Sequence, residues 1–306
     1  MLHPDLSAAR WLPTLSFGAR TLRLVRRVPV PAATVRAGLA VEDIHIDGPA
    51  GTLRLRLYRP AGLSRPAPAL LWFHGGGYVM GWPEQDDRTC QAIADRRQMT
   101  VASVDYRLAP EHPFPAALED GHTALHWLLD NSTQRHVDTT RIALGGASAG
   151  GGLAAALAQR VHDEGPVTLV FQLLVYPMLD DRTVSRSAPR GRDLRVWTPA
   201  SNRFGWSSYL ASACGGRQLP PYAVPARREH LAGLPPAWIG VGSDDLFLDE
   251  DRVYADRLTA AGVPTRLVVI PGAFHGFDKV FPGKAVSRRF LEDQLDALSA
   301  ALQPDA

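Results

Sequence analysis

The chain has 306 residues, of which 45% are hydrophobic and 21% charged, and a formal net charge of +2. This length fits one large α/β domain or two small ones, with a sizeable core. Because the net charge is small and the arginines are scattered, no nucleic-acid partner is expected. Cys90 and Cys214 show no metal-ligand or redox spacing, so we expect two free thiols in a reducing compartment.

Membrane and export signals are missing from the sequence pattern. The longest apolar run, residues 169–179, is too short to span a membrane and contains Gln172 and Pro177, which is typical of a buried strand. The N-terminus shows no basic leader, apolar stretch or cleavage site of a signal peptide. We therefore expect a cytoplasmic protein without a membrane span.

The first forty residues have apolar side chains, Leu15 among them, at near-helical spacing, and Pro29 and Pro31 then break this pattern. Residues 41–46 and 53–58 alternate apolar with polar side chains. This alternation predicts an antiparallel pair of strands at the edge of a sheet.

Further along the chain, strand-like apolar runs alternate with runs of helical period. The expected strands are 69–73, 100–104, 141–145, 168–175, 237–241 and 265–270, and the expected helices are 88–97, 116–129, 153–158, 249–261 and 284–302. Such alternation predicts a parallel sheet covered by helices on both faces. The segment at about 181–220 lacks strand period and interrupts the alternation, so we interpret it as an insertion over the active edge of the sheet.

Two glycine motifs provide what acyl transfer requires. The segment Gly146-Ala147-Ser148-Ala149-Gly150 lies between a strand-like and a helix-like run, which is the context of a nucleophile elbow. Glycines two residues either side of Ser148 are needed because side chains there would collide with the strand and the helix. The upstream loop His74-Gly75-Gly76-Gly77 offers bare N–H groups to a developing oxyanion. We expect the oxyanion donors to be Gly75, Gly76 and Ala149.

A nucleophilic serine also needs a base and an acid that orients the base. His275 and Asp245 each follow a predicted strand, as Ser148 does, and the carboxyl ends of parallel strands meet at one edge of the sheet. Asp244 is the main rival of Asp245 for the acid, whereas Asp249 falls where a helix begins and is better suited to its first turn.

Several long motifs in the right order make the chain resemble the hormone-sensitive-lipase-like branch of the α/β-hydrolases, which are carboxylesterases. The matching segments are residues 74–78, 105–117, 148–151, 175–177, 245–250 and 275–277. The family usually has Asp before the nucleophile, where this chain has Ala147. Ala147 is not part of the expected triad, so the change bears on hydrogen bonding beneath the elbow and on substrate preference.

The resemblance implies a single α/β-hydrolase domain over residues 1–306, with a mostly parallel eight-stranded sheet flanked by helices. It implies a catalytic core of residues 41–180 and 221–306, and a helical cap made of residues 1–40 and about 181–220. It also implies no metal or organic cofactor. Because edge strands often pair between subunits in this family, a homodimer through a sheet edge is a further expectation.

The expected activity is hydrolysis of short- to medium-chain acyl esters, which are small-molecule substrates. Amide, lactone or carbamate hydrolysis would use the same residues, and a non-catalytic binder on the same scaffold is the alternative from a different class. Tyr78, Trp206 and Tyr209 are candidates for the substrate pocket, although core packing of the cap explains such aromatics equally well. A metal site of His112, His122 and His126 is not expected, since no acid partner is evident.

Overall fold

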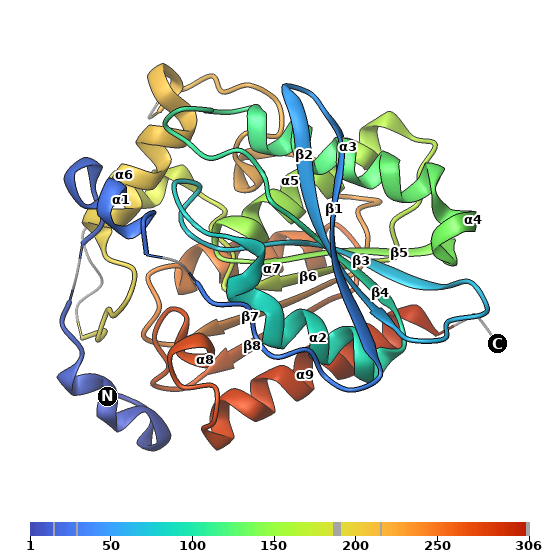
Figure 1. The fold of residues 1–306 in the computed structure, drawn as a ribbon. Helices are drawn as coiled ribbons and strands as arrows, with labels where there is room; N and C mark the ends of the chain where they lie inside the picture. Colours follow the sequence, from blue (N-terminus) through green and yellow to red (C-terminus); the bar gives the residue numbers. More distant parts are fainter. Residues whose placement is uncertain (15, 29, 186–190, 215, 304–306) are drawn as a thin grey trace.

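The computed structural model describes residues 1–14, 16–28, 30–185, 191–214 and 216–303. Leu15 and Pro29 of the N-terminal pattern, and residues 186–190 and 215 of the insertion, lie outside the described residues. The centre of the fold is an eight-stranded sheet in the order β1-β2-β4-β3-β5-β6-β7-β8 (Figure 1). Its strands are β1 Leu39–Gly48, β2 Gly51–Pro60, β3 Ala67–Phe73, β4 Thr100–Val104, β5 Val137–Ala147, β6 Phe171–Val175, β7 Ala237–Gly242 and β8 Thr265–Ile270.

Strand direction follows the sequence pattern. The alternating strands β1 and β2 pair antiparallel, and β2 pairs antiparallel with β4, whereas all other neighbouring strands are parallel. The continuous apolar runs form the inner strands, which are buried on both faces. The predicted fold class is therefore confirmed. The strand expected over 168–175 begins only at Phe171, where pairing with Ala143 of β5 starts.

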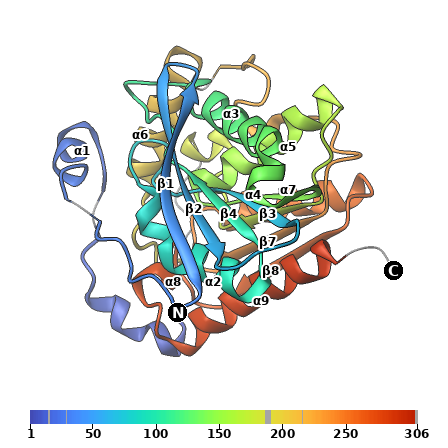
Figure 2. The same cartoon turned by 45° about the vertical axis from the view of Figure 1, so that its right-hand side comes forward.

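Helices cover both faces of the sheet (Figures 1 and 2). On one face α2 and α9 pack against each other, and on the other α3 and α5 pack together with α7 beside them. No helix in the described ranges is long and apolar enough to cross a membrane. The helices are α1 Ala19–Val25, α2 Asp87–Arg97, α3 Ala116–Asp130, α4 Ser132–Arg135, α5 Ala149–Glu164, α6 Pro199–Leu210, α7 Leu248–Ala260, α8 Phe277–Val280 and α9 Ala285–Leu302, with 3₁₀ turns η1 Pro4–Trp11, η2 Pro83–Asp86, η3 Asp181–Ser185, η4 Ala211–Ala213 and η5 Pro225–Arg227.

One part of the N-terminal segment packs against the core, and another part contacts the insertion. Its first turn, η1, packs on α9, where Leu6 is fully buried and Asp5 accepts a hydrogen bond from the Val286 N–H at 3.0 Å. Further on, the Phe17 N–H donates to Ser201 Oγ of α6 at 2.8 Å. The part of this segment around Phe17 therefore contacts the helix of the proposed cap, whereas η1 packs on the core.

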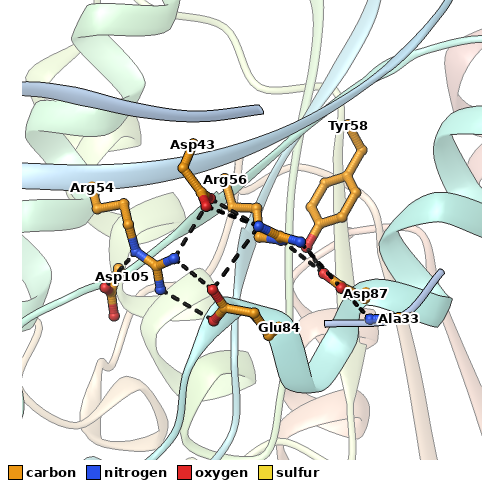
Figure 3. Close-up of polar contacts among 8 residues, drawn as sticks. All are labelled: Ala33, Asp43, Arg54, Arg56, Tyr58, Glu84, Asp87 and Asp105. Carbon is orange, nitrogen blue, oxygen red and sulfur yellow. Dashed lines mark hydrogen bonds and ion pairs between the residues drawn. The ribbon is translucent and has the colours of Figure 1, made fainter. Parts of the chain in front are cut away.

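A network of charges joins the N-terminal segment, the edge of the sheet and α2 (Figure 3). Arg56 of β2 binds Asp87 of α2 at 2.9 Å and Asp43 of β1 at 3.0 Å. Asp87 also accepts hydrogen bonds from the Tyr58 hydroxyl and from the Ala33 N–H, both at 2.7 Å. Because every acceptor of this buried carboxylate is used, the network fixes the start of α2.

The same network reaches the glycine loop. Arg54 binds Glu84 of η2 at 2.5 Å and Asp105, just after β4, at 2.9 Å (Figure 3). Hydrogen bonding to Glu84 is the main reason that the pKa of Arg54 is raised. Beside Glu84, the Gln85 side chain donates to the Gly75 carbonyl at 3.3 Å. The charged residues of β2 thus hold the turn that supports the glycine loop.

Candidate active site

Ser148 occupies a sharp turn between β5 and α5. Its φ of 57° and ψ of −120° are strained for a residue with a side chain. A Cβ at Gly146 would lie 2.4 Å from the backbone of Gly150, and one at Gly150 would lie 2.1 Å from the Phe73 carbonyl at the end of β3. The two glycines are therefore required sterically, as the sequence pattern predicts.

His275 and Asp245 come to Ser148 from the carboxyl ends of β8 and β7. His275 Nε2 lies 2.9 Å from Ser148 Oγ, and its Nδ1 lies 2.8 Å from Asp245 Oδ2. The other oxygen of Asp245 accepts the Phe247 N–H at 2.9 Å, which fixes the carboxylate. The exposed fractions are 4% for Ser148, 5% for His275 and 0% for Asp245, so the whole chain of contacts is shielded from water.

The rival acids point elsewhere. Asp244 is buried, but its Oδ2 pairs with the amino terminus of Met1 at 3.8 Å. Asp249 lies in the first turn of α7, as its position in the sequence predicts, and pairs with Arg192 at 2.6 Å. Of the three carboxylates, Asp245 is the one in hydrogen-bond contact with His275.

The glycine loop lies directly against the elbow. A Cβ at Gly75 would be 3.3 Å from the Ser148 Cβ, which places this backbone beside the hydroxyl. Gly76 has a φ of 127°, and a Cβ there would lie 1.8 Å from the Met80 carbonyl, so this tight turn requires glycine. Ala149 is the first residue of α5, where backbone N–H groups have no partner within the helix. Of the three expected oxyanion donors, Gly75 thus lies against Ser148, Gly76 follows Gly75 in the same loop, and Ala149 directly follows Ser148.

His74 anchors the loop. Its ring is fully buried, stacks on Tyr106 with centroids 4.2 Å apart, and has Nδ1 2.9 Å from the Gly75 carbonyl. Burial is the main cause that lowers the pKa of His74. The Tyr106 hydroxyl donates to the His74 carbonyl at 2.7 Å. These contacts fit a neutral structural histidine and not a base.

The three candidate pocket aromatics form one buried cluster. Tyr78 stacks on Tyr209 with centroids 4.0 Å apart and meets Trp206 at 5.3 Å. The Tyr78 hydroxyl, which donates to the Met178 carbonyl, would lie 2.4 Å from a Cβ at Gly152, one turn after Ser148. The cluster therefore packs the glycine loop, α5 and α6 against one another. That these three aromatics also line the substrate pocket is a proposal.

Trp197 lies beside the histidine, and Phe17 packs on Trp197. Trp197 lies 6.5 Å from His275 between ring centroids, and a Cβ at Gly77 would lie 2.1 Å from the Trp197 ring. Phe17 stacks on Trp197 with centroids 6.2 Å apart. The sequence pattern gives Phe17 no role, because its partner is far away in the chain.

Tyr176 is a neighbour of the histidine that sequence analysis gives no role. It follows β6, has a φ of 36°, and its ring meets His275 edge-on at 4.8 Å between centroids. Its hydroxyl donates to Asp278 at 2.9 Å. The signal that could have found it is its place at the carboxyl end of a predicted strand.

Within the described residues, one group of His, Cys, Asp or Glu side chains has the spacing of metal ligands. It consists of His122, His126 and Glu164, which lie on α3 and α5 and not at the Ser148 elbow. Cys90 and Cys214 are free thiols, as predicted.

Comparison with known proteins places this geometry in a family. The family described as alpha/beta hydrolase fold matches residues 70–279. Esterase LipI of Mycobacterium tuberculosis is 41% identical over 251 residues, which are 81% of this chain and 78% of LipI. Carboxylesterase NlhH of the same organism is 38% identical over 229 residues, which are 73% of this chain and 70% of NlhH.

Solved structures of esterases superpose closely on this chain. A bacterial heroin esterase superposes with a TM-score of 0.91 at 33% identity, covering 99% of this chain and 98% of its own. Esterase LipW from Mycobacterium marinum superposes with a TM-score of 0.88 at 37% identity, covering 99% and 96%. The chain therefore belongs to the α/β-hydrolase fold family, in its hormone-sensitive-lipase-like branch of carboxylesterases.

Proposed function

We propose that the protein hydrolyses short- to medium-chain acyl esters with Ser148 as nucleophile, His275 as general base and Asp245 as the acid that orients it. The contacts from Asp245 through His275 to Ser148 Oγ, at 2.8 and 2.9 Å, carry this proposal. His275 takes the hydroxyl proton as Ser148 attacks the ester carbonyl, and Asp245 stabilises the imidazolium that forms.

Charge then develops on the carbonyl oxygen. The proposed donors to this oxyanion are the backbone N–H groups of Gly75, Gly76 and Ala149, and each such donor typically contributes about 3 kcal/mol to the transition state. The imidazolium of His275 gives its proton to the departing alcohol, which leaves an acyl group on Ser148. Water, activated by the same histidine, attacks this acyl-enzyme and regenerates the serine.

The aromatic surroundings support acyl groups of limited length. Tyr78, Trp206 and Tyr209 contact one another at ring distances of 4.0 to 6.1 Å and form a closed wall next to the first turn of α5. Trp197 lies 6.5 Å from His275 between ring centroids. We propose that these rings bind the acyl chain and limit its length.

A p-nitrophenyl ester series from acetate to palmitate tests the proposal on wild type, Ser148→Ala and Ser287→Ala. Ser287 is a buried serine of α9 and serves as the matched control. We expect activity to peak at short or medium chains, to fall at least about 10⁴-fold in Ser148→Ala and to persist in Ser287→Ala.

Two results would contradict the proposal. Undiminished turnover by folded Ser148→Ala would reject the nucleophile. Absence of turnover by folded wild type on every ester would favour a binder, or an amide, lactone or carbamate substrate. A maximum at palmitate would reject only the acyl-length limit.

A further inference from the structure

A cluster of three metal-ligand side chains lies between α3 and α5. His126 Nε2 is 3.2 Å from His122 Nε2, and His122 Nε2 is 2.8 Å from Glu164 Oε2. The ligand atoms of all three residues lie within 4.8 Å of one another. No acid partner of this histidine pair is evident in the sequence, and the fold provides one from the end of α5.

Helix geometry brings the ligands together. His122 and His126 are four residues apart, so they lie on one face of α3. Glu164 ends α5, which packs beside α3. Arg160, one turn before Glu164, bridges the two helices by binding Glu119 of α3 at 2.9 Å. The two histidines and the glutamate are therefore held by rigid elements and not by loops.

We propose that His122, His126 and Glu164 bind a divalent transition metal of the Zn²⁺ class. Two ligands bound at about 2.0–2.1 Å in a tetrahedral site lie about 3.3 Å apart. The 3.2 Å between the two imidazole nitrogens matches this edge, and the contact between His122 and Glu164 has to widen by about 0.5 Å. Each histidine binds through Nε2 and keeps its proton on Nδ1.

The carboxylate of Glu164 is oriented by a contact with Arg160. Arg160 Nε donates to Glu164 Oε1 at 2.8 Å, whereas His122 contacts the other oxygen, Oε2. The two carboxylate oxygens thus have separate partners, so a cation at Oε2 leaves the Arg160 contact in place. A charged partner that orients a ligating carboxylate in this way is usual at protein metal sites.

The space beside the histidines is open and negatively charged. A surface pocket of about 540 Å³ is lined by both histidines together with Asp47 and Asp130, which are exposed. Their charges favour a cation, and the pocket admits the water that completes a tetrahedral shell. The donor set of two imidazoles, one carboxylate and one water is of borderline softness and suits Zn²⁺, Co²⁺ or Ni²⁺.

This site is separate from the proposed catalysis. Ser148 precedes the first residue of α5 and Glu164 is its last, so the two ends are roughly 22 Å apart along the helix. The bound ion therefore clamps α3 to α5 and stabilises the fold, and it does not touch the reacting ester.

Metal titration of chelator-treated protein tests the site. We expect one equivalent of Co²⁺ to give the visible absorption of tetrahedral coordination, Zn²⁺ to displace it, and the Tm to rise with Zn²⁺ concentration. In His126→Gln and Glu164→Gln the affinity for Zn²⁺ should fall roughly tenfold or more. The matched control is His112→Gln, which removes an exposed histidine outside the cluster and should bind as wild type does.

The Tm of each variant without metal shows whether the variant is folded, and esterase activity stays an independent readout. The site is rejected if wild type shows no saturable one-to-one binding, or if His126→Gln and Glu164→Gln bind Zn²⁺ as tightly as wild type. In either case the contacts among His122, His126 and Glu164 are hydrogen bonds only.

Discussion

Asp244 and Asp245 are adjacent carboxylates in one loop, and they have different partners. Asp245 is held between His275 Nδ1 and the Phe247 N–H, at 2.8 and 2.9 Å. The closest charged partner of Asp244 is the Met1 amino group, 3.8 Å away. Their place after one strand does not separate them, because they differ by one position, and the sequence favours Asp245 only through the family pattern Asp-x-x-x-Asp-Glu, which Asp245, Asp249 and Glu250 match.

Replacing each by asparagine separates the two roles. Asp245→Asn preserves the shape but cannot hold the reactive tautomer of His275, so we expect kcat to fall by roughly 10⁴-fold. Asp244→Asn should stay within about threefold of wild type. Steady-state kinetics on p-nitrophenyl butyrate, with circular dichroism to verify folding, measures both, and a larger loss in Asp244→Asn would assign the acid to Asp244.

At the scale of elements, α7 is tied to the segment that follows β6 through one buried acid. Glu250 accepts hydrogen bonds from the Leu179 N–H at 2.7 Å and the Asp180 N–H at 3.1 Å, and a further one from the Thr183 hydroxyl. Burial raises the pKa of Glu250 to about 8, although these hydrogen bonds lower it. The link holds η3, where the insertion begins, against the core.

This raised pKa makes stability depend on pH. Between about pH 4.5 and 8 the native state keeps a proton on Glu250 that the unfolded chain releases, so this group makes the fold less stable as pH rises, by up to about 1.4 kcal/mol per pH unit. Glu250→Gln cannot ionise, and it should therefore gain stability relative to wild type from pH 5 to pH 8.

Urea unfolding at pH 5, 6.5 and 8 measures the difference. The exposed residue Glu229 offers the control Glu229→Gln, which should follow the wild-type pH profile. A constant difference between Glu250→Gln and wild type at all three values would contradict the raised pKa.

The strands that deliver the site could be predicted from sequence, because each is a continuous apolar run followed at once by a polar or glycine motif. Ser148, Asp245 and His275 follow β5, β7 and β8 for this reason. Parallel pairing then brings the ends of these strands to one edge of the sheet, so topology places the three loops close together.

The contacts between the N-terminal segment and the insertion near the site could not be predicted in the same way. Phe17 stacks on Trp197, and the Ser16 hydroxyl lies 2.9 Å from that of Thr198, yet these residues are about 180 positions apart and neither segment has a clear period. The cluster of His122, His126 and Glu164 could not be predicted from the sequence for the same reason. The spacing of its histidines is visible in the sequence, whereas the contact with Glu164 depends on how α3 packs on α5.

At the scale of the whole molecule, the two edges of the sheet differ in chemistry. β1 exposes Glu42, Asp43 and Asp47, charges that discourage pairing with another strand. β8 at the other edge is apolar from Leu267 to Ile270, and these residues are half-buried. We therefore expect the predicted homodimer to form through β8, with two copies related by a two-fold axis.

The hydrogen bonds of β8 show where this pairing can be broken. The Ile270 carbonyl accepts from Ser243 and the Pro264 carbonyl from Ala237, so even-numbered residues of β8 bond to β7. The N–H of Val269 therefore faces the open edge, because successive residues of a strand alternate in direction. Val269→Pro removes this donor without disturbing the pairing with β7.

Sedimentation equilibrium then decides the prediction. We expect dimers for wild type, a dissociation constant at least about tenfold higher for Val269→Pro, and unchanged dimers for Val269→Thr, which keeps both the N–H and the branched side chain. Since the proposed triad lies within one chain, the monomeric variant should retain its esterase activity. If wild type stays monomeric at every concentration, no dimer forms through β8. If Val269→Pro dimerises as tightly as Val269→Thr, the subunits associate through a surface other than β8.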